Sequence, residues 1–331
     1  MIKIIDFFVY TFVIIAFLFL LVLVVLYFTP NPIFKIANSI PIEENLSKPD
    51  NYSNIESSVT VNKNIPYTNE YKNNKLDIYS PKDFKGKLPV VLFIHGGGFF
   101  KGDKEMAKYF GPTISNSHYS FISINYDLAP DTTLFNQVQQ INEAIKFIKK
   151  NENNYCLDTS SINLSGSSAG GFLALQLLSA YHNKKYTKEL QIIPVENIKF
   201  NSLLLYSSVY NLSEFQKFNG NILTNYLLSK IGWGLTGEKK WKTNRDLGEK
   251  LNLNNYVNSG FPPIFITDGN TKTFTEQAED YANILIKKHV PVKTLFFDSK
   301  NKVGHGYQLK MNTEASKQAV KESLKFLQKW N

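Results

Sequence analysis

Ser168 is the residue whose surroundings point most directly to chemistry. It lies in the run Gly166-Ser-Ser-Ala-Gly-Gly171, after the apolar run 162–165 and before the helix-like run 172–180. A serine hydroxyl alone is a poor nucleophile, and a tight strand-to-helix turn raises it above a sheet where a base can reach it. Gly166 and Gly170 are small enough to let strand and helix approach closely. The pattern predicts a nucleophile elbow, although a non-catalytic glycine-rich turn has the same spacing.

A second glycine run, His95-Gly-Gly-Gly-Phe99, follows another strand pattern. Acyl transfer builds negative charge on a carbonyl oxygen, and backbone N–H groups aimed at that oxygen stabilise it. We expect Gly97 and Gly98 to supply two such donors and the amide of Ala169 to supply a third, while Gly96 allows the turn. The spacing differs from both phosphate-binding glycine motifs, which argues against a nucleotide cradle.

A serine nucleophile needs a base, and the chain has five histidines. His305 lies in Val303-Gly-His-Gly-Tyr307, after the last predicted strand, where the chain order Ser, acid, His of a hydrolase sheet places the base. His95 belongs to the glycine loop and is expected to stabilise it. The other three lie in turns or at element ends: His118, His182 and His289.

These loops must be positioned by a scaffold, and strand and helix patterns alternate along the chain. The strands are predicted at 76–79, 89–94, 120–126, 162–165, 200–206, 263–267 and 292–297. Helical periodicity is found at 134–150, 274–288 and 315–330. This alternation predicts an α/β fold with a mostly parallel sheet covered by helices on both faces. The segment 211–260 interrupts the alternation and is interpreted as a lid or cap over the active site.

Five motifs in order make the chain similar to a known family. They are His95-Gly-Gly-Gly-Phe99, Tyr126-Asp-Leu-Ala-Pro130, the Ser168 run, Pro262-Pro263 and Gly304-His305. Together they resemble the hormone-sensitive-lipase-like branch of the α/β-hydrolase fold from about residue 67 to 330. The resemblance implies carboxylic ester hydrolysis through an acyl-enzyme, with no metal or organic cofactor.

The acid of the expected triad departs from the family pattern. After the Pro-Pro strand the family resembles Gly-Asn-x-Asp-Pro-Leu, and this chain has Lys272 where the aspartate is expected. A lysine has the wrong charge to stabilise an imidazolium. Asp268, at the carboxyl end of the same strand, is the first alternative, and a plain turn role is equally compatible with its position. Glu276 and Glu214 are the other candidates.

The amino-terminal residues differ from the rest of the chain in being almost entirely apolar. After a flank at 1–6, residues 7–28 are almost wholly apolar and long enough to span a bilayer as one helix. A cleaved secretory signal is the rival interpretation, but the run is long and lacks a small-x-small site. We expect a single-pass anchor, an irregular polar tether at 29–58, and a hydrolase domain at 59–331. With the amino terminus inside the cell, the domain lies outside.

The composition argues against nucleic-acid binding and excludes an intrachain disulfide. The 331 residues include 43% hydrophobic residues, enough for a large core, and a formal charge of +9. The lysines are scattered rather than clustered, which favours a solvated surface over a nucleic-acid-binding patch. Cys156 is the single cysteine, so an intrachain disulfide is impossible.

The sequence therefore predicts a membrane-anchored serine esterase. Ser168 attacks, His305 transfers the proton, and the substrate is a short or medium acyl ester, or an acetyl ester on a surface glycan if the domain faces outward. Lys272 motivates a second hypothesis, a catalytically weak hydrolase-fold protein that serves as a surface binding module. A serine peptidase is a third and weaker possibility.

Overall fold

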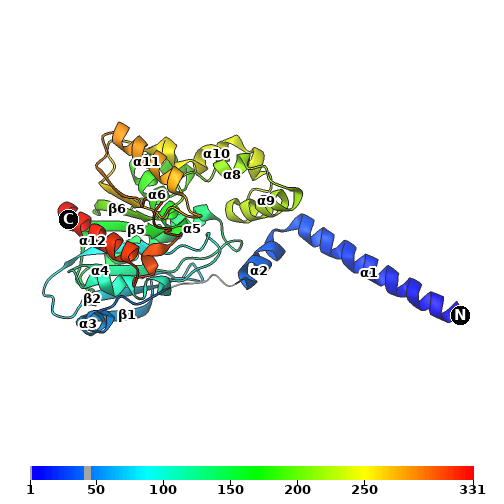
Figure 1. Ribbon diagram of the computed structural model, residues 1–331, viewed down its shortest axis with the longest axis horizontal. Helices are drawn as coiled ribbons and strands as arrows, with labels where there is room; N and C mark the ends of the chain where they lie inside the picture. Colours follow the sequence, from blue (N-terminus) through cyan, green and yellow to red (C-terminus); the bar gives the residue numbers. More distant parts are fainter. Residues whose placement is uncertain (1, 41–45) are drawn as a thin grey trace.

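The computed structural model describes residues 2–40 and 46–331 (Figure 1). Its single sheet has eight strands in the order β1-β2-β4-β3-β5-β6-β7-β8. The β1–β2 and β2–β4 pairs are antiparallel, and every other pair is parallel. The predicted mostly parallel sheet is therefore confirmed. The strands are β1 (Val59–Pro66), β2 (Lys75–Pro81), β3 (Leu88–Ile94), β4 (Ser120–Ile124), β5 (Leu157–Ser167), β6 (Phe200–Tyr206), β7 (Ile264–Thr267) and β8 (Val292–Leu295).

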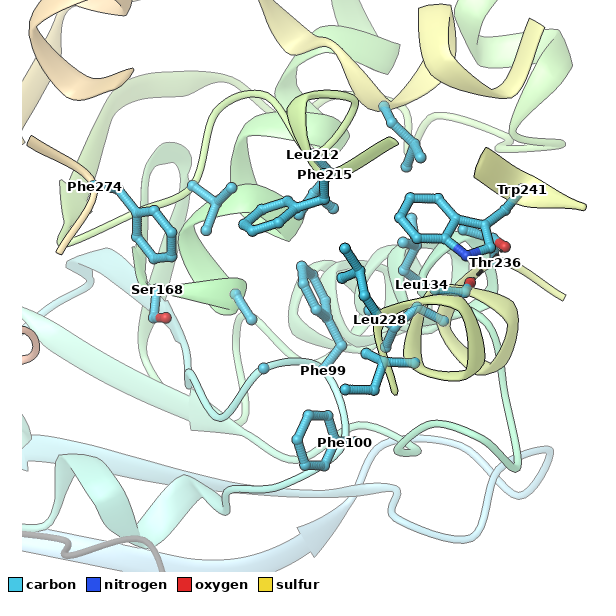
Figure 2. Close-up of a pocket in the computed structure, with 17 residues that line it drawn as sticks. Phe99, Phe100, Leu134, Ser168, Leu212, Phe215, Leu228, Thr236, Trp241 and Phe274 are labelled. Carbon is cyan, nitrogen blue, oxygen red and sulfur yellow. Dashed lines mark hydrogen bonds between the residues drawn. The ribbon is translucent and has the colours of Figure 1, made fainter. Parts of the chain in front are cut away.

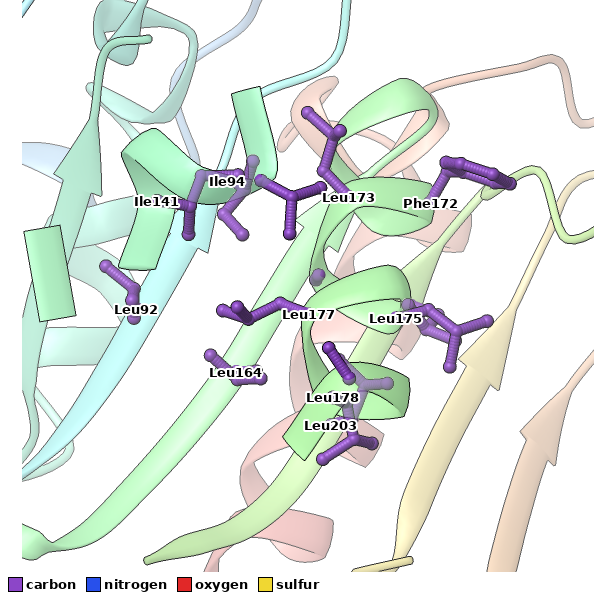
Figure 3. Packing of buried hydrophobic residues seen from close by; sticks show 14 of the residues in the cluster. Leu92, Ile94, Ile141, Leu164, Phe172, Leu173, Leu175, Leu177, Leu178 and Leu203 are labelled. Carbon is purple, nitrogen blue, oxygen red and sulfur yellow. The ribbon is translucent and has the colours of Figure 1, made fainter. Parts of the chain in front are cut away.

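Helices cover both faces of the sheet, as the alternation predicts. Side chains alternate along β3: Val90, Leu92 and Ile94 pack with the helices at 134–150, 169–182 and 275–287, whereas Val91 and Phe93 pack with those at 110–115 and 314–330. Figure 3 shows the first of these two clusters. The helices of the sheet layers are α4 (Phe110–Ser115), α5 (Leu134–Lys150), α6 (Ala169–His182), α7 (Lys184–Glu189), α11 (Thr275–Lys287) and α12 (Glu314–Trp330), with the short helices η1 (Lys104–Ala107) and η4 (Tyr307–Leu309).

The edge strand β1 is absent from the sequence prediction. Only Val59 of its eight residues is buried, and most of the others face solvent. A strand exposed on both faces lacks the alternation of apolar and polar residues from which strands are recognised. Its backbone pairing with β2 determines its conformation.

The segment 29–58 also differs from expectation. The irregular tether predicted there contains two helices, α2 (Asn31–Ser39) and α3 (Tyr52–Ser58), on either side of the residues not described. Both pack on the domain, since Phe34 and Ile55 are buried. The prolines and asparagines that indicated a loop are accommodated at the helix start, where Pro32 lies in the first turn of α2.

Helix α1 (Ile2–Phe28) projects from the domain and includes the predicted anchor (Figure 1). Within the described residues, its segment Ile5–Phe28 is long and apolar enough to cross a membrane, and none of it is buried by protein. A signal sequence near an amino terminus passes the same test.

The insertion at 211–260 lies between β6 and β7 and forms a separate group of helices. These are α8 (Glu214–Lys217), α9 (Ile222–Thr236), η2 (Trp241–Thr243), α10 (Arg245–Leu251) and η3 (Leu253–Tyr256). Trp241 is buried, and its indole nitrogen donates a hydrogen bond of 3.0 Å to the carbonyl of Ser229. This bond ties α9 to the rest of the insertion.

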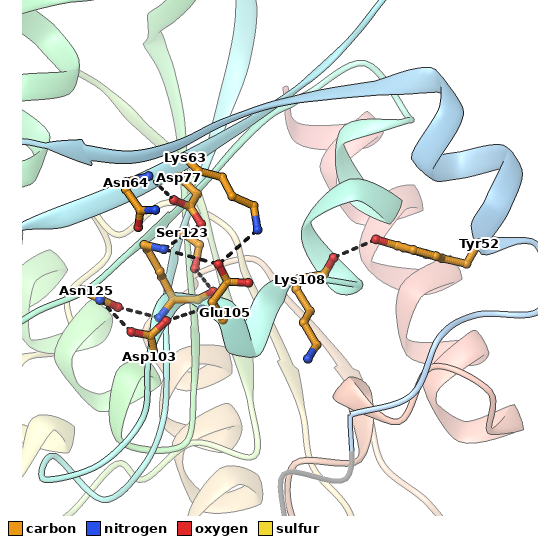
Figure 4. A network of polar contacts seen from close by, with 10 residues as sticks. Tyr52, Lys63, Asn64, Asp77, Asp103, Glu105, Lys108, Ser123 and Asn125 are labelled. Atoms are coloured by element: carbon orange, nitrogen blue, oxygen red, sulfur yellow. Dashed lines mark hydrogen bonds and ion pairs between the residues drawn. The ribbon is translucent and has the colours of Figure 1, made fainter.

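A polar network fixes the chain after the glycine loop (Figure 4). The buried Lys104 ammonium lies 2.9 Å from the Asp77 carboxylate, and the Lys104 amide donates to the Asn125 side chain over 2.6 Å. Removing one partner of a buried ion pair leaves an uncompensated charge and typically costs about 3–5 kcal/mol. The network therefore holds η1 against β2 and the end of β4.

Candidate active site

Ser168 lies in a strained turn between β5 and α6. Its backbone has φ 53° and ψ −121°, which a residue with a side chain rarely adopts. The turn depends on its glycines: a Cβ at Gly166 would lie 2.4 Å from the carbonyl oxygen of Gly170, and one at Gly170 would lie 2.1 Å from that of Ile94. The structure thus has the strand, turn and helix of a nucleophile elbow.

The loop after β8 brings His305 to this serine. The His305 Nε2 atom lies 2.9 Å from Ser168 Oγ. The loop is attached to neighbouring strands, because the Gln308 side chain donates to Ser167 Oγ over 2.7 Å and the Gly306 amide donates to Ser207 Oγ over 3.3 Å. The predicted nucleophile and base are therefore brought together within hydrogen-bond distance.

Asp268 reaches His305 through another side chain. Thr273 Oγ1 lies 3.1 Å from His305 Nδ1 and donates its proton to Asp268 Oδ1 over 2.5 Å. The Asp268 carboxylate also accepts from the amides of Gly269, over 2.8 Å, and Phe274, over 3.0 Å. The first alternative for the acid is thus placed behind the histidine, with a threonine hydroxyl between them.

These contacts determine which atom of His305 carries the proton. The one hydroxyl proton of Thr273 is donated to Asp268, so the Thr273 oxygen accepts from Nδ1–H of His305. The neutral ring then has an unprotonated Nε2, which accepts the hydroxyl proton of Ser168. This is the tautomer that a general base requires.

Burial and charge act in opposite directions on the two titratable groups. Desolvation lowers the pKa of His305, and the negative charge of Asp268 opposes that change. Desolvation raises the pKa of Asp268, while hydrogen bonds from Thr273, Ser207 and the Gly269 amide stabilise its ionised form. Perturbed groups that face one another beside a cavity are typical of catalytic sites.

The other two acid candidates lie elsewhere. Glu214 is at the start of α8 and accepts from the side chains of Asn211, over 3.3 Å, and Gln277, over 2.7 Å. Glu276 is exposed in the first turn of α11. Lys272, at the position where the resemblance predicts an aspartate, has φ 53°. The structure therefore does not bring either glutamate or Lys272 into the hydrogen-bonded group of Ser168 and His305.

The glycine loop lies against the elbow. A Cβ at Gly96 would lie 2.9 Å from the carbonyl oxygen of Ser167, and Gly97 has φ 111°, so both positions favour glycine. His95 is buried, stacks on Tyr126 at 4.3 Å, and donates from Nδ1 to the Gly96 carbonyl over 2.7 Å. Burial lowers the pKa of His95 to about 4, so its ring is neutral.

Two cavities adjoin Ser168. The first, of about 220 Å³, also reaches Gly98 and Ala169 and lies beneath the insertion (Figure 2). Its lining is almost entirely apolar: Phe99, Phe100, Leu134, Val209, Leu212, Phe215, Leu228, Ile231, Gly232, Leu235, Thr236, Trp241, Leu251 and Phe274 complete it. The second, of about 360 Å³, is bordered by Gly96, Gly97, Gly98 and His305 and includes Lys101 and Lys310. Of the three predicted oxyanion donors, Gly98 lines both cavities, Gly97 only the second and Ala169 only the first, and Ser168 lines both.

Thr273 is a site residue that the sequence prediction missed. Threonine is common in turns, and no pattern distinguishes a hydroxyl that joins two groups from one that faces water. A usable signal is its place next to Lys272, because a departure at the acid position directs attention to polar neighbours in the same loop.

Solved structures similar to this chain include esterases. Esterase B from Lactobacillus Rhamnosis superimposes with a TM-score of 0.74 at 21% identity, over 86% of this chain and 88% of its own. A truncated carbohydrate esterase from gut microbiota gives a TM-score of 0.65 at 18% identity, over 88% and 98% of the two chains. At such identities the likeness shows the fold, and it is that of the α/β hydrolases.

Curated relatives agree with this assignment. A putative alpha/beta hydrolase of Acanthamoeba polyphaga mimivirus is 24% identical over 68% of this chain. A probable isoprenylcysteine alpha-carbonyl methylesterase of Oryza sativa subsp. japonica is 32% identical over 32% of it. The matches span 63% of the viral protein and 25% of the plant protein. The BD-FAE family model matches residues 76–282, well over half of the chain and including Ser168, Asp268 and Thr273. The chain therefore belongs to the BD-FAE family of α/β hydrolases, in agreement with the resemblance drawn from its motifs.

Proposed function

We propose that the protein is a membrane-anchored serine hydrolase of carboxylic esters. The observation that carries this proposal is the 2.9 Å contact between Ser168 Oγ and His305 Nε2, at a strained elbow between two cavities. Nucleophile, base and an acid-linked hydroxyl form one hydrogen-bonded chain, which is the arrangement that activates a serine. Membership of an α/β-hydrolase family with esterase relatives supports the same reaction.

The reaction follows from these positions. Ser168 Oγ attacks the ester carbonyl carbon while His305 Nε2 takes its proton, and a tetrahedral oxyanion forms. The amides of Gly97, Gly98 and Ala169 donate to that oxygen. His305 then returns the proton to the departing alcohol. Water, deprotonated by the same imidazole, attacks the acyl-enzyme and releases the acid.

Asp268 stabilises the charged intermediate through Thr273. When His305 becomes an imidazolium, its Nδ1–H still donates to the Thr273 oxygen, and Thr273 still donates to the Asp268 carboxylate. A hydrogen bond to an ionised acceptor is stronger than a neutral one, and polarisation passes along the chain. The carboxylate thus acts on His305 without direct contact.

The sizes and linings of the two cavities support a proposal for the substrate class. The apolar cavity of about 220 Å³ receives the acyl chain, and the second, of about 360 Å³, receives the alcohol. Ligand pockets commonly enclose about 300–1,000 Å³, so the acyl cavity lies below that range and favours short or medium chains. An acetyl ester on a surface glycan is the variant that applies if the domain faces outward.

Helix α1 supplies the membrane anchor in this proposal. Its 24-residue segment Ile5–Phe28 exceeds the length of about 20 apolar residues that crosses a bilayer. We place the amino terminus inside the cell and the catalytic domain outside. Accessibility of single labelled cysteines to a membrane-impermeant reagent in intact cells tests this orientation, and labelling only after lysis would contradict it.

A fluorophosphonate probe tests the enzyme against the binding module. The full chain in detergent is expected to form a covalent adduct and to hydrolyse p-nitrophenyl butyrate. Ser168→Ala abolishes the adduct and lowers kcat by about 10⁶-fold, as the loss of a nucleophile does in serine hydrolases. Ser259→Ala, which removes an exposed hydroxyl outside both cavities, is the matched control and retains the adduct. A folded wild-type protein that takes no label and hydrolyses no ester would favour the binding module.

A further inference from the structure

Helix α9 of the insertion has two apolar faces with different surroundings. Leu228, Ile231 and Leu235 recur at helical spacing and line the acyl cavity beneath the insertion. Ile222, Tyr226 and Trp233 recur at spacings of four and seven residues. With 3.6 residues per turn, this second set lies on the face opposite the first. One face of α9 thus lines the acyl cavity, and the cavity does not account for the apolar residues on the opposite face.

The opposite face contacts the end of α1. The Lys230 ammonium, on the same face, donates to the carbonyl oxygens of Leu26 and Tyr27. Its nitrogen also lies 4.7 Å from the centre of the Trp233 ring. Lys239, just beyond α9, lies 3.7 Å from the centre of the Tyr27 ring. These contacts attach the carboxyl-terminal half of α9 to the last turn of α1. Figure 1 shows α9 near the end of α1.

The amino-terminal half of the same face is bare. Ile222 is 91% exposed and Leu223 is 65% exposed at the start of α9, and Tyr226 in the next turn and Phe218, which precedes the helix, are also exposed. Large apolar side chains exposed as a contiguous group mark an interaction surface. This exposed group lies on the same helix as the contact between α9 and α1, and that contact is made at the carboxyl-terminal end of the apolar helix α1.

We propose that this surface, formed by Phe218, Ile222, Leu223 and Tyr226, enters the interfacial layer of the bilayer that α1 spans, and that the enzyme takes an amphiphilic acyl ester from that leaflet. The inference rests on the proposed esterase function and deepens it. Aromatic rings and lysines gather at the level of lipid headgroups, and Tyr27, Trp233 and Lys239 lie together at the end of α1. A helix beside them, with apolar residues outward, lies in the plane of that layer.

The acyl cavity lies beside the helix that we propose to contact the lipid leaflet. The same helix that meets the leaflet forms one wall of the cavity, so an acyl chain leaving the bilayer passes along α9 to reach Ser168. The inference therefore names the substrate class as esters with one apolar tail and a polar alcohol, presented at a lipid surface.

Depth-dependent quenching tests the contact directly. Leu223→Cys in a Cys156→Ser background carries the one thiol of the chain, which is labelled with bimane in the full-length protein reconstituted into phosphatidylcholine vesicles. Nitroxide-labelled lipids are expected to quench this fluorophore severalfold. The matched control is Ile193→Cys in the same background, since Ile193 is 84% exposed and lies after α7, away from α9 and the end of α1. Equal, weak quenching at both positions would overturn the proposal.

Activity tests the consequence for the substrate. The double substitution Ile222→Ser and Leu223→Ser is expected to reduce hydrolysis of monodecanoylglycerol, a medium-chain ester, in vesicles by about tenfold, because it removes two apolar side chains from the contact. Hydrolysis of soluble p-nitrophenyl acetate stays within about twofold, since both residues lie outside the cavity lining. Ile193→Ser changes neither activity. Equal loss on both substrates, or no loss on either, would contradict the proposal.

The two proposals fail in different ways. Normal, Ser168-dependent hydrolysis of the soluble ester without quenching at position 223 would exclude the membrane contact and retain the esterase. Strong quenching at 223 without any Ser168-dependent ester hydrolysis would exclude the esterase, and the substrate inference that rests on it, while leaving the lipid contact in place.

Discussion

The turn that carries Ser168 and the loop that carries Asp268 serve the same site under different constraints. In the turn, Gly166 and Gly170 face backbone atoms so closely that even a methyl group overlaps them. In the loop, Lys272 replaces the expected aspartate and lies in a left-handed conformation without disturbing the contact between Ser168 and His305. The first region matches the motif expected from the sequence, and the second departs from it.

The difference reflects what each region must provide. A nucleophile must be placed to a fraction of an ångström beside the oxyanion donors, so its backbone path is fixed by steric limits. The acid must provide negative charge and a hydrogen-bond acceptor behind the imidazole. A carboxylate can do this from another backbone position if a hydroxyl spans the gap, as Thr273 does between Asp268 and His305.

Gly170→Ala, in the turn that carries Ser168, is expected to have the largest effect and tests whether steric limits fix the backbone there. The added Cβ would lie 2.1 Å from the Ile94 carbonyl oxygen and 2.3 Å from that of His95, so the elbow must move away from the glycine loop. We expect a loss of more than about 3 kcal/mol in unfolding free energy and at least about 10³-fold in kcat/KM. Thermal melting and ester hydrolysis measure both.

Gly304→Ala is the matched control for that change. Gly304 adjoins His305, but a Cβ there has open space within 4 Å. Its stability is expected to stay within about 0.5 kcal/mol of wild type. If both alanine variants behave alike, the steric contrast between the two regions is wrong.

Asp268→Asn is the next largest effect, because it removes the charge but keeps the shape. We expect kcat to fall by about 10²-fold, less than the roughly 10⁴-fold loss seen when a directly bonded triad aspartate is replaced by asparagine. Glu214→Gln and Glu276→Gln are matched controls and stay within about twofold. A large loss in either glutamine variant would transfer the acid role to that residue.

The pH dependence of kcat/KM predicts the direction in which Asp268→Asn shifts the pKa of His305. In the proposed mechanism His305 acts as the base only when it is neutral. Desolvation lowers its pKa, so we expect the acid limb of kcat/KM to have its midpoint below the ordinary histidine value of about 6.5. The charge of Asp268 raises the pKa of His305, and Asp268→Asn removes that effect. The midpoint therefore moves to still lower pH. An unchanged midpoint would show that Asp268 carries no charge in the active enzyme.

Thr273→Val has a smaller effect and tests the link itself. Valine keeps the volume but can neither accept from His305 nor donate to Asp268. A fall of about 10- to 50-fold in kcat with KM unchanged is expected, whereas Thr273→Ser stays within about threefold. Because both residues act through one chain, combining Thr273→Val with Asp268→Asn adds little to the loss from Asp268→Asn alone. Additive losses would mean that Asp268 acts on His305 by another path.

The same contrast explains what the sequence alone could predict. The fold follows from apolar periodicity, and the elbow and glycine loop follow from steric requirements that only glycine meets, so Gly96, Gly166 and Ser168 are recognisable in the chain. The contact through Thr273 depends on where a hydroxyl points after the loop has folded. The strand β1 and the helices at 31–39 and 52–58 depend on tertiary packing in the same way, because most of their residues are polar or exposed.

Lys272→Asn is expected to give the smallest effect, and it tests whether the loop that carries Asp268 tolerates a change at position 272. Lys272 is exposed and has φ 53°, a conformation that costs most residues about 1 kcal/mol and that asparagine adopts more readily. The unfolding free energy should rise by a few tenths to about 1 kcal/mol, with kcat/KM within about twofold. Lys185→Asn in α7, where the backbone is helical, is the control and gives no gain. Because the acid loop needs only the Thr273 and Asp268 contacts, relief of strain at position 272 leaves the chemistry unchanged, whereas a large fall in activity would show that Lys272 itself takes part.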